Sequence, residues 1–235
     1  MYNNKKVTVV IPCYNEETGI KAICCAMPSF IDEVIVIDNN SNDNTADVAR
    51  RYGAKVIFME ERGYGLAYQK ALPEASGDII IMIDGDNSYL VSEAEKILLY
   101  METKNYDFLS GCRFPLTNKR TMPFIKMLSN HLFSYSIRKC FRIGLIDSQS
   151  GMIVFKSYLI KQILPLNPSM GFSFEIKLNA WLNPSIQSGE LHINYNMRSG
   201  KVKFRSLFDS IKILFDALFF FCNHVNQNNL SLSKR

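Results

Sequence analysis

The chain is poor in the residues that build zinc centres and disulfide frameworks. Its 235 residues include six cysteines and three histidines. No two cysteines have Cys-x-x-Cys spacing, and the adjacent Cys24 and Cys25 lie in an apolar context typical of reduced thiols. His131 and His192 lack neighbours at metal-binding spacing, so we interpret both as structural. The composition therefore argues against zinc and favours a reducing compartment.

The chain also lacks a long hydrophobic run near its start. The apolar residues after Lys6 stop at Pro12, which is too short a stretch for a signal peptide. No internal repeat, low-complexity tract or clear linker precedes the C-terminal tail. We expect one α/β domain in the cytoplasm, and we leave open a peripheral attachment to the cytoplasmic face of the membrane.

The charges are unevenly placed. The formal net charge is +5, and basic residues gather in the second half of the chain while acidic residues concentrate in the first. This pattern suits a ligand that bears phosphate, or an anionic membrane surface. A solvated basic face explains the same pattern. We expect no nucleic acid partner, because no recognition motif is present.

Short apolar runs alternate with helical patterns along the first half of the chain. The expected strands cover residues 7–12, 34–38, 55–58 and 79–83, and the expected helices cover 20–27, 46–52 and 66–75. This β-α-β-α-β-α-β order predicts a mostly parallel sheet flanked by helices, with right-handed crossovers. Farther on, Ser92–Glu95 has capping-box spacing at the start of a helix. We also expect strands at 106–110, 152–155 and after Gly189, and helices over 122–140 and 172–181.

The most informative segment is the end of the fourth strand, where buried apolar residues stop at Asp84-Gly85-Asp86. Mg²⁺ takes carboxylate oxygens, keeps several waters and shares its site with substrate phosphates, so a pair of aspartates is sufficient. By itself the pattern is more often a helix cap than a metal site. Read as a metal site, it predicts Mg²⁺ or Mn²⁺ on Asp84 and Asp86, together with a nucleotide diphosphate.

Polar residues also follow the other predicted strands, and ligands of parallel sheets bind beyond the carboxyl ends of the strands. These positions hold Pro12, Tyr14, Glu16, Asp38, Asn40, Arg62 and Gly63. Asp38 can accept a hydrogen bond from a base, Asn40 can bond the base or ribose, and Gly63 allows close backbone approach. Each has an ordinary explanation, such as a turn after Asp38 or a surface position for Arg62. Their coincidence at one sheet edge predicts a nucleotide site.

These segments resemble the successive motifs of family 2 glycosyltransferases with the GT-A fold. The matching motifs are Val10–Glu16, Ile37–Thr45, Arg62–Gly65 and Asp84–Asp86. Later segments resemble the dolichol-phosphate mannosyltransferase-like branch, which transfers sugars to polyprenyl phosphates. These are Ser110–Phe114, Asp147–Gly151, Glu175 in its helix and Tyr195–Lys203. The resemblance implies a GT-A fold and a nucleotide-sugar site formed by the residues named above, Gly85 included.

Phosphate handling and acceptor binding are expected from a second group of residues. Arginine can form a bidentate fork on phosphate and lysine a mobile point charge, which points to Arg113, Arg198 and Lys203. Asp147 matches the acceptor-side aspartate of the family, either as general base for a hydroxyl acceptor or as an orienting group beside a phosphate acceptor. Gln149 is expected to support the same region. Glu175 is either a structural partner of Arg198 or unrelated to it.

Four residues at three sites depart from the family pattern. Asn39 and Asn40 stand where glycine or aspartate-glycine is usual, which leaves the base of the donor open. Ser88 replaces a glutamine often found two residues beyond the second metal aspartate, so metal affinity or donor choice can differ. Val202 replaces a serine before the last lysine of the motif and removes one hydroxyl donor.

The C-terminal region carries a long helical stripe of apolar residues from Phe204 to Cys222. The expected division is a catalytic domain over 1–203, an amphipathic helix over 204–225 and a polar tail over 226–235. The helix is too charged and too short to span a bilayer. Packing on the domain, an interfacial position on a membrane, and a dimer contact are the three interpretations.

The leading hypothesis is a metal-dependent, inverting glycosyltransferase. It would move a hexose from a nucleotide diphosphate sugar, of the GDP-mannose or UDP-glucose type, to polyprenyl phosphate at the membrane surface. The second hypothesis is transfer to a saccharide hydroxyl in surface polysaccharide assembly, with Asp147 as an essential base. A nucleotide-sugar-binding module without catalysis is the third.

Overall fold

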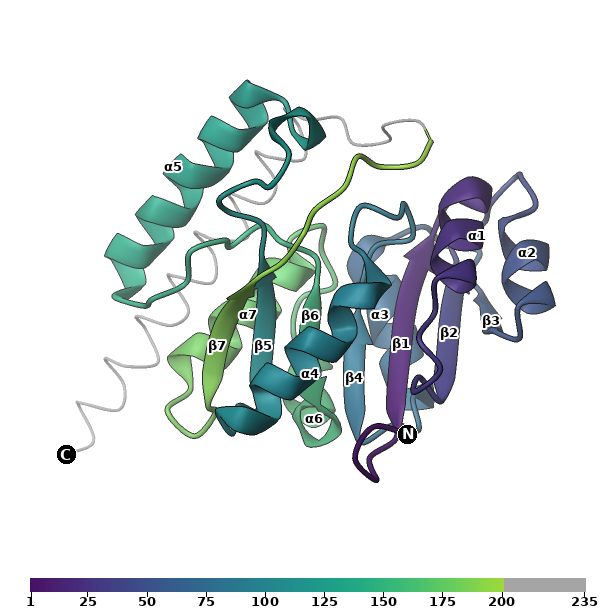
Figure 1. Cartoon of the computed structure of the whole chain (residues 1–235), viewed down its shortest axis with the longest axis horizontal. Helices are drawn as coiled ribbons and strands as arrows, with labels where there is room; N and C mark the ends of the chain where they lie inside the picture. Colours follow the sequence, from purple (N-terminus) through teal and green to yellow (C-terminus); the bar gives the residue numbers. More distant parts are fainter. Residues whose placement is uncertain (201–235) are drawn as a thin grey trace.

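The computed structural model describes residues 1–200 of the chain, which form a three-layer α/β arrangement around one sheet (Figure 1). The strands are β1 Val7–Cys13, β2 Glu33–Asp38, β3 Lys55–Phe58, β4 Ile79–Met82, β5 Phe108–Cys112, β6 Ile153–Lys156 and β7 Ser188–His192. The helices are α1 Glu17–Cys25, α2 Thr45–Arg51, α3 Tyr64–Ala71, α4 Ala94–Thr103, α5 Phe124–Phe141, α6 Ile160–Ile163 and α7 Phe172–Leu182. Short 3₁₀ turns cover Leu72–Glu74, Val91–Glu93, Lys119–Thr121 and Ser157–Leu159.

The sheet has seven strands in the order β3-β2-β1-β4-β6-β5-β7. The pairs β1–β2, β1–β4, β2–β3 and β5–β7 are parallel, whereas β6 runs antiparallel to both β4 and β5. The α/β class and the mostly parallel sheet are thus confirmed, with one reversed strand. Strand β6 is reversed because α5 lies beyond one end of the sheet and does not cross a face. The chain therefore re-enters the sheet from the same edge at which β5 ends (Figure 1).

The core consists of two apolar layers, one on each face of the sheet. Alternate residues of β1 point to opposite layers, Val9 and Ile11 to one and Val10 to the other. The first layer is closed by apolar side chains of α1, α2 and α4, and the second by those of α3, α6 and α7. Because the central strands are covered on both sides, their sequences are continuous apolar runs rather than alternating ones.

Two local expectations were wrong. Ser92 does not cap a helix, because Val91–Glu93 forms a 3₁₀ turn and α4 begins at Ala94 with no side-chain cap. The strand expected to reach Tyr195 ends at His192. Tyr195 instead makes an isolated antiparallel bridge with Tyr89. Tyr89 directly follows residues 84–88, which we call the acidic loop. This bridge brings the chain after β7 back to the carboxyl edge of β4.

No helix within residues 1–200 is long and apolar enough to cross a membrane. Lys203, the helix expected over 204–225 and the tail over 226–235 lie outside the described residues.

Candidate functional site

The carboxyl ends of β1, β2 and β4 meet at one edge of the sheet, and Asp84 lies there just beyond β4. Its Oδ1 accepts a hydrogen bond from the hydroxyl of Tyr64 at 3.1 Å, and that hydroxyl is also 2.7 Å from Ser173 Oγ. Gly151 backs the same carboxylate so closely that a Cβ there would lie 2.8 Å from Oδ2. The carboxylate is therefore fixed from two sides.

Asp86 is held by Ser88, one of the residues that depart from the family pattern. The backbone N–H of Ser88 and its hydroxyl donate to Asp86 Oδ1 at 3.0 and 2.5 Å. Ser88 therefore orients the second carboxylate, although it stands where the family often has a glutamine. On the other side, Arg198 Nη1 lies 3.6 Å from Asp86 Oδ2, and Ser199 N donates to the Asp86 carbonyl at 2.7 Å.

The surroundings of Asp84 disfavour its ionised form. Burial, and next the negative charge of Asp86, raise the pKa of Asp84 to about 6, although Tyr64, Arg113 and Arg198 oppose the rise. Two partly buried carboxylate groups on one loop suit a hard divalent cation. Within residues 1–200 no cluster of three or more His, Cys, Asp or Glu side chains forms a metal cage. The cation would therefore draw its other ligands from water and substrate phosphates, as Mg²⁺ and Mn²⁺ do.

The residues expected to bind the base come together beside this loop. The guanidinium of Arg62 stacks on the ring of Tyr14 at 4.1 Å, and its Nη2 donates to the Asn40 carbonyl at 3.2 Å. Asp38 is buried, and its Oδ1 accepts from the backbone N–H of Ser41 at 3.1 Å. Tyr14, Asp38, Asn40 and Arg62 thus form a polar rim with an aromatic face, which can hold a flat base. We call these residues the base rim.

Close backbone contacts bring the base rim and the acidic loop together. A Cβ on Gly85 would lie 2.5 Å from Cys13 Sγ and 3.1 Å from the Pro12 carbonyl. A Cβ on Gly19, in α1, would lie 2.3 Å from the Gly85 carbonyl. Only glycine permits this approach, so the loop after β4 rests directly on β1 and α1. Gly19 was not among the predicted site residues, and a helical glycine gives little signal in a single sequence.

Glu16 joins the acidic loop to the segment after β7. Its Oε1 accepts from Arg198 Nη2 at 3.0 Å. Arg198 thus bridges Glu16 and Asp86. Glu175, the other expected partner of Arg198, is buried within α7.

Arg113 and Asp147 form a buried bidentate ion pair. Arg113 Nε and Nη2 donate to Asp147 Oδ2 and Oδ1 at 2.7 and 2.8 Å, and the Arg113 backbone N–H donates to Oδ2 at 3.0 Å. The two side chains are 3% and 0% exposed. Burial alone would raise the pKa of Asp147, but the charge of Arg113 holds that pKa below its usual value. Asp147 as placed is an ion-pair partner and not an accessible base.

Two charged residues that sequence reasoning missed, one buried and one half-buried, support the Asp147 loop. Lys177 of α7 is fully buried and donates to the carbonyls of Asp147 and Ser148 at 3.1 and 3.3 Å. Burial lowers the pKa of Lys177 to about 8. Glu190 of β7 accepts from the backbone N–H groups of Ile146 and Asp147. A lysine inside an otherwise apolar helix pattern was the available signal.

The remaining acceptor-side residues lie near this loop. The backbone N–H of Gln149 donates to Asp147 Oδ1 at 3.3 Å, and within residues 1–200 its side-chain amide nitrogen is buried without a hydrogen-bond partner. Lys126, in the first turn of α5, is attracted electrostatically by Asp86 and Asp84 and repelled by Arg113 and Arg198. Lys126 was not predicted as a site residue.

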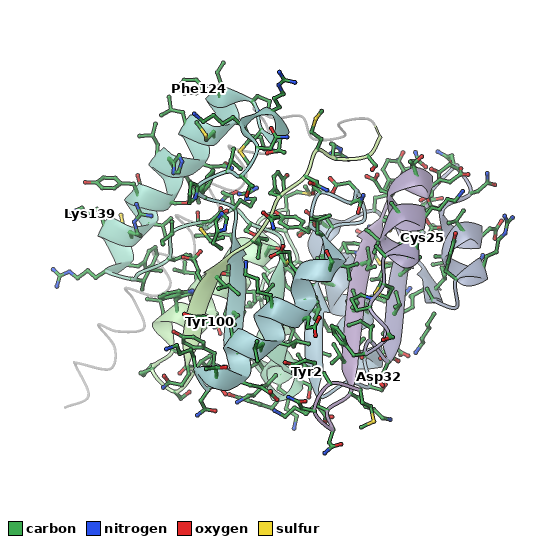
Figure 2. The ribbon with its side chains drawn as sticks, in the orientation of Figure 1. Tyr2, Cys25, Asp32, Tyr100, Phe124 and Lys139 are labelled. Carbon is green, nitrogen blue, oxygen red and sulfur yellow. The ribbon has the colours of Figure 1, made fainter. Side chains whose placement is uncertain are left out.

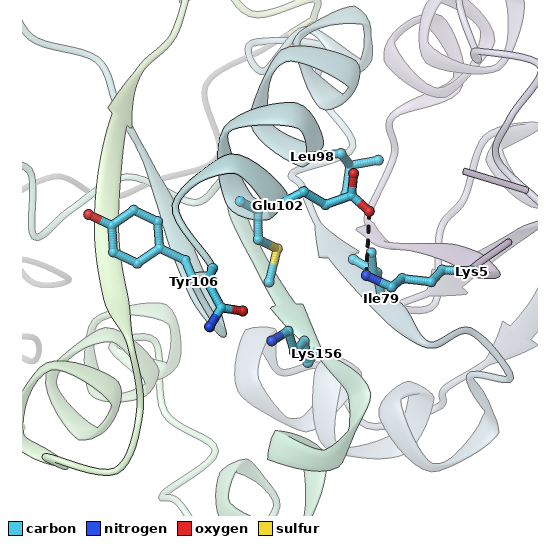
Figure 3. A pocket seen from close by; sticks show the side chains of 8 residues that line it. Lys5, Ile79, Leu98, Glu102, Tyr106 and Lys156 are labelled. Carbon is cyan, nitrogen blue, oxygen red and sulfur yellow. Dashed lines mark hydrogen bonds and ion pairs between the residues drawn. The ribbon is translucent and has the colours of Figure 1, made fainter. Parts of the chain in front are cut away.

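A hollow of about 260 Å³ lies at the opposite edge of the sheet and is separate from this site (Figure 3). Lys5 precedes β1 and Ile79 begins β4, so the hollow is at the amino ends of these strands. The Lys5–Glu102 ion pair, at 3.4 Å, lies across it.

Known proteins align with most of this chain. An uncharacterised glycosyltransferase of Mycobacterium tuberculosis is 29% identical over 194 residues, which cover 83% of this chain and 87% of the relative. A dolichyl-phosphate hexose transferase of Haloferax volcanii is 27% identical over 205 residues and covers 86% and 88%.

Among solved structures, glucosyl-3-phosphoglycerate synthase from Mycobacterium tuberculosis matches with a TM-score of 0.71 and 18% identity. The match covers 94% of this chain and 81% of the synthase. That synthase has been crystallised with Mn²⁺ and uridine diphosphate. At this identity the likeness establishes the GT-A fold.

The profile described as Glycosyl transferase family 2 matches residues 8–164, which include β1, the acidic loop and the Arg113–Asp147 pair. With the strand-end carboxylates and the base rim on one sheet edge, this match shows that the chain is a glycosyltransferase and belongs to glycosyl transferase family 2.

Proposed function

We propose that this enzyme is a metal-dependent, inverting glycosyltransferase that moves a hexose from a nucleotide diphosphate sugar to polyprenyl phosphate. The donor is of the GDP-mannose or UDP-glucose type, and the cation is Mg²⁺ or Mn²⁺ on Asp84 and Asp86. The relationship to a dolichyl-phosphate hexose transferase supports the acceptor, and the Mn²⁺ and uridine diphosphate complex of the fold neighbour supports the donor and cation.

The observation that carries the choice of acceptor is the burial of Asp147. Both of its oxygens bind Arg113, and its side chain is 0% exposed. A hydroxyl acceptor needs a base within hydrogen-bond reach of its proton. A phosphate monoester does not, because its second pKa is about 6 and it is largely ionised at pH 7. The buried pair therefore favours the phosphate acceptor over the saccharide hydroxyl.

On the donor side, Arg62 and Tyr14 offer a stacked edge to the base, and Asp38 offers a carboxylate. A bound divalent cation would neutralise charge that develops on the diphosphate leaving group. Asp84 and Asp86 would hold it, oriented by Tyr64 and Ser88.

On the acceptor side, the cationic residues hold the phosphate and need no proton transfer. Arg198 lies 3.6 Å from Asp86, and its Nε is buried without a hydrogen-bond partner among residues 1–200. This donor is available to a phosphate oxygen. Lys126 adds charge from α5, and Lys203 is proposed to do so from outside the described residues. An acceptor oxygen then attacks the sugar C1 as the bond from C1 to the diphosphate breaks, which inverts the anomeric configuration.

The direct test is transfer of radiolabel to lipid. A panel of labelled nucleotide sugars is incubated with polyprenyl phosphate and Mn²⁺, and the product is extracted into organic solvent. We expect one sugar to enter the organic phase, and we expect Asp86→Asn to reduce this transfer at least about a hundredfold.

Two outcomes would reject parts of the proposal. Label that enters a water-soluble glycan, and never the lipid, would make the acceptor a saccharide hydroxyl. Failure of both UDP and GDP, each with Mn²⁺, to raise the thermal midpoint of the protein would reject the donor site itself.

A further inference from the structure

Helix α5 exposes an apolar face that the sheet and its flanking helices leave uncovered. Its inner face packs through Ile137 on Phe174 and Leu178 of α7, and the hydroxyl of Ser134 lies 2.9 Å from Ser148 Oγ. The outward side chains are Phe124, Ile125, Leu128, Leu132 and Tyr135, which are 70%, 81%, 47%, 59% and 53% exposed. Figure 2 shows Phe124 and Lys139 at the two ends of α5, both directed away from the body of the protein.

The outward residues form one continuous stripe. Ile125, Leu128, Leu132 and Tyr135 are spaced by three or four residues, which places them above one another on successive turns of the helix, and Phe124 adjoins Ile125. The stripe runs from Phe124 to Tyr135, a length of about 17 Å at the rise of an α-helix. Single exposed apolar residues need no explanation, but a continuous apolar stripe marks a surface that contacts another apolar phase.

The charges around this stripe are all of one sign. From Phe108 to Ile146 the chain has no aspartate or glutamate. The same 39 residues contain seven basic side chains. Arg113 is buried in its pair with Asp147, and the other six are Lys119, Arg120, Lys126, Arg138, Lys139 and Arg142. An apolar stripe flanked by basic residues is the pattern of a helix that lies in the surface of an anionic bilayer.

The position of α5 relates this stripe to the active site. Figure 1 shows α5 beyond the carboxyl edge of the sheet, above β5 and β7 and on the same side as the loop after β4. Lys126, in its first turn, is within electrostatic range of Arg113 and Arg198 as well as Asp86 and Asp84. A bilayer seated on the outer face of α5 would therefore bring lipid phosphates to the rim that holds the metal-binding carboxylates.

We infer that the exposed face of α5 docks this enzyme on an anionic lipid bilayer, with the helix lying in the interface. The inference deepens the proposed function and relies on it only for the identity of the acceptor. Residues 204–225, for which an interfacial position was one of three interpretations, are not required for it.

The test uses the full chain and vesicles that contain no polyprenyl phosphate. Binding is measured by co-sedimentation with vesicles of phosphatidylcholine, alone or mixed with phosphatidylglycerol. We expect stronger binding to the mixed vesicles, and at least about tenfold weaker binding for Ile125→Ser/Leu132→Ser, because burial of one such side chain is worth about that factor. The matched control is Phe58→Ser/Leu99→Ser, which removes side chains of 55% and 59% exposure from β3 and α4.

A positional readout separates the bilayer from other occupants of the face. Phospholipids with brominated chains quench a tryptophan that enters the bilayer. We expect them to quench the added tryptophan of Ile125→Trp and to leave that of Leu99→Trp unchanged. Equal vesicle binding by both double variants and the parent would overturn the inference. So would an Ile125→Trp signal that lipid never quenches, because a second copy or residues 201–235 would then cover the face. Vesicle binding by a protein that never glycosylates polyprenyl phosphate would leave the docking surface intact and reject the acceptor.

Discussion

At the scale of single residues, the placement of Asp84 depends on Gly151, the last residue of the Asp147–Gly151 motif. A Cβ on Gly151 would lie 2.8 Å from Asp84 Oδ2 and 3.1 Å from Oδ1. Gly151→Ala should therefore displace the carboxylate without burying a new polar group. We expect at least about a tenfold loss of affinity for Mn²⁺ in the presence of nucleotide, which corresponds to about 1.4 kcal/mol. Isothermal titration measures it.

The matched substitution is Gly144→Ala. Among residues 1–200 its Cβ would meet only the ring of Trp181, at 3.3 Å, and lies away from both carboxylates. If Gly144→Ala and Gly151→Ala weaken Mn²⁺ binding equally, the effect is general and Gly151 has no special role at the metal site.

The raised pKa of Asp84 makes cation binding sensitive to pH. With a pKa of about 6 in the folded protein, raised by burial and by Asp86, the carboxyl is protonated below this value and a proton competes with the cation. The folded pKa exceeds the usual value of 3.8, so the metal-free protein gains stability from this group as the pH falls through about 6. We expect the stabilisation of the protein by Mn²⁺ and nucleotide to weaken over the same range.

Thermal midpoints recorded from about pH 7 to about pH 5, with and without Mn²⁺, test this prediction. Asp84→Asn has no titrating group at this position and should flatten the profile of the metal-free protein. A metal-free profile that is the same in Asp84→Asn and the parent would assign the pH dependence to other groups.

At the scale of elements, the Arg113–Asp147 pair fastens the end of β5 to the loop that precedes β6. Asp147→Asn keeps the shape of the side chain but leaves the buried guanidinium of Arg113 without its anion. Loss of one member of a buried pair costs about 3 to 5 kcal/mol, so we expect the free energy of unfolding in urea to fall by roughly that amount. Lost turnover in Asp147→Asn would then not identify Asp147 as a base.

The control is Asp47→Asn, which removes a surface partner of Arg50 and should change the unfolding free energy little. An Asp147→Asn protein that is as stable as the parent, yet inactive on every acceptor, would contradict the structural role and restore Asp147 as general base.

The elements themselves follow from the sequence to a large extent. Strands β1, β2 and β4 are apolar on both faces, and the turn residues after them mark their ends, so both the strands and their shared edge were predictable. The reversal of β6 was not, because it depends on α5 leaving the sheet rather than crossing a face. The segment after β7 was misjudged for a similar reason, since Tyr195 pairs with Tyr89 across more than a hundred residues.

At the scale of the whole molecule, the donor half of the site was more predictable than the acceptor half. Asp38, Arg62, Asp84 and Asp86 follow strands directly, so local pattern places them at one edge. Lys177 and Glu190 come from elements near the end of the described chain and meet Asp147 only through tertiary packing. Their roles depend on contacts that no local spacing encodes.

The same long-range pairing predicts that residues 1–200 unfold as one cooperative unit. Strand β6 pairs with β4 of the donor half and β5 of the acceptor half, so neither half can separate without breaking the sheet. Trp181, the only tryptophan, lies in α7 and reports on the acceptor half, whereas far-UV circular dichroism reports on the whole chain. We expect the two urea transitions to coincide, and Mn²⁺ with the donor nucleotide to shift both equally, because a ligand of the native state stabilises the entire cooperative unit. A tryptophan transition that precedes the dichroism transition, and that nucleotide leaves in place, would divide the protein into two independently folding halves and contradict the single catalytic domain expected over residues 1–203.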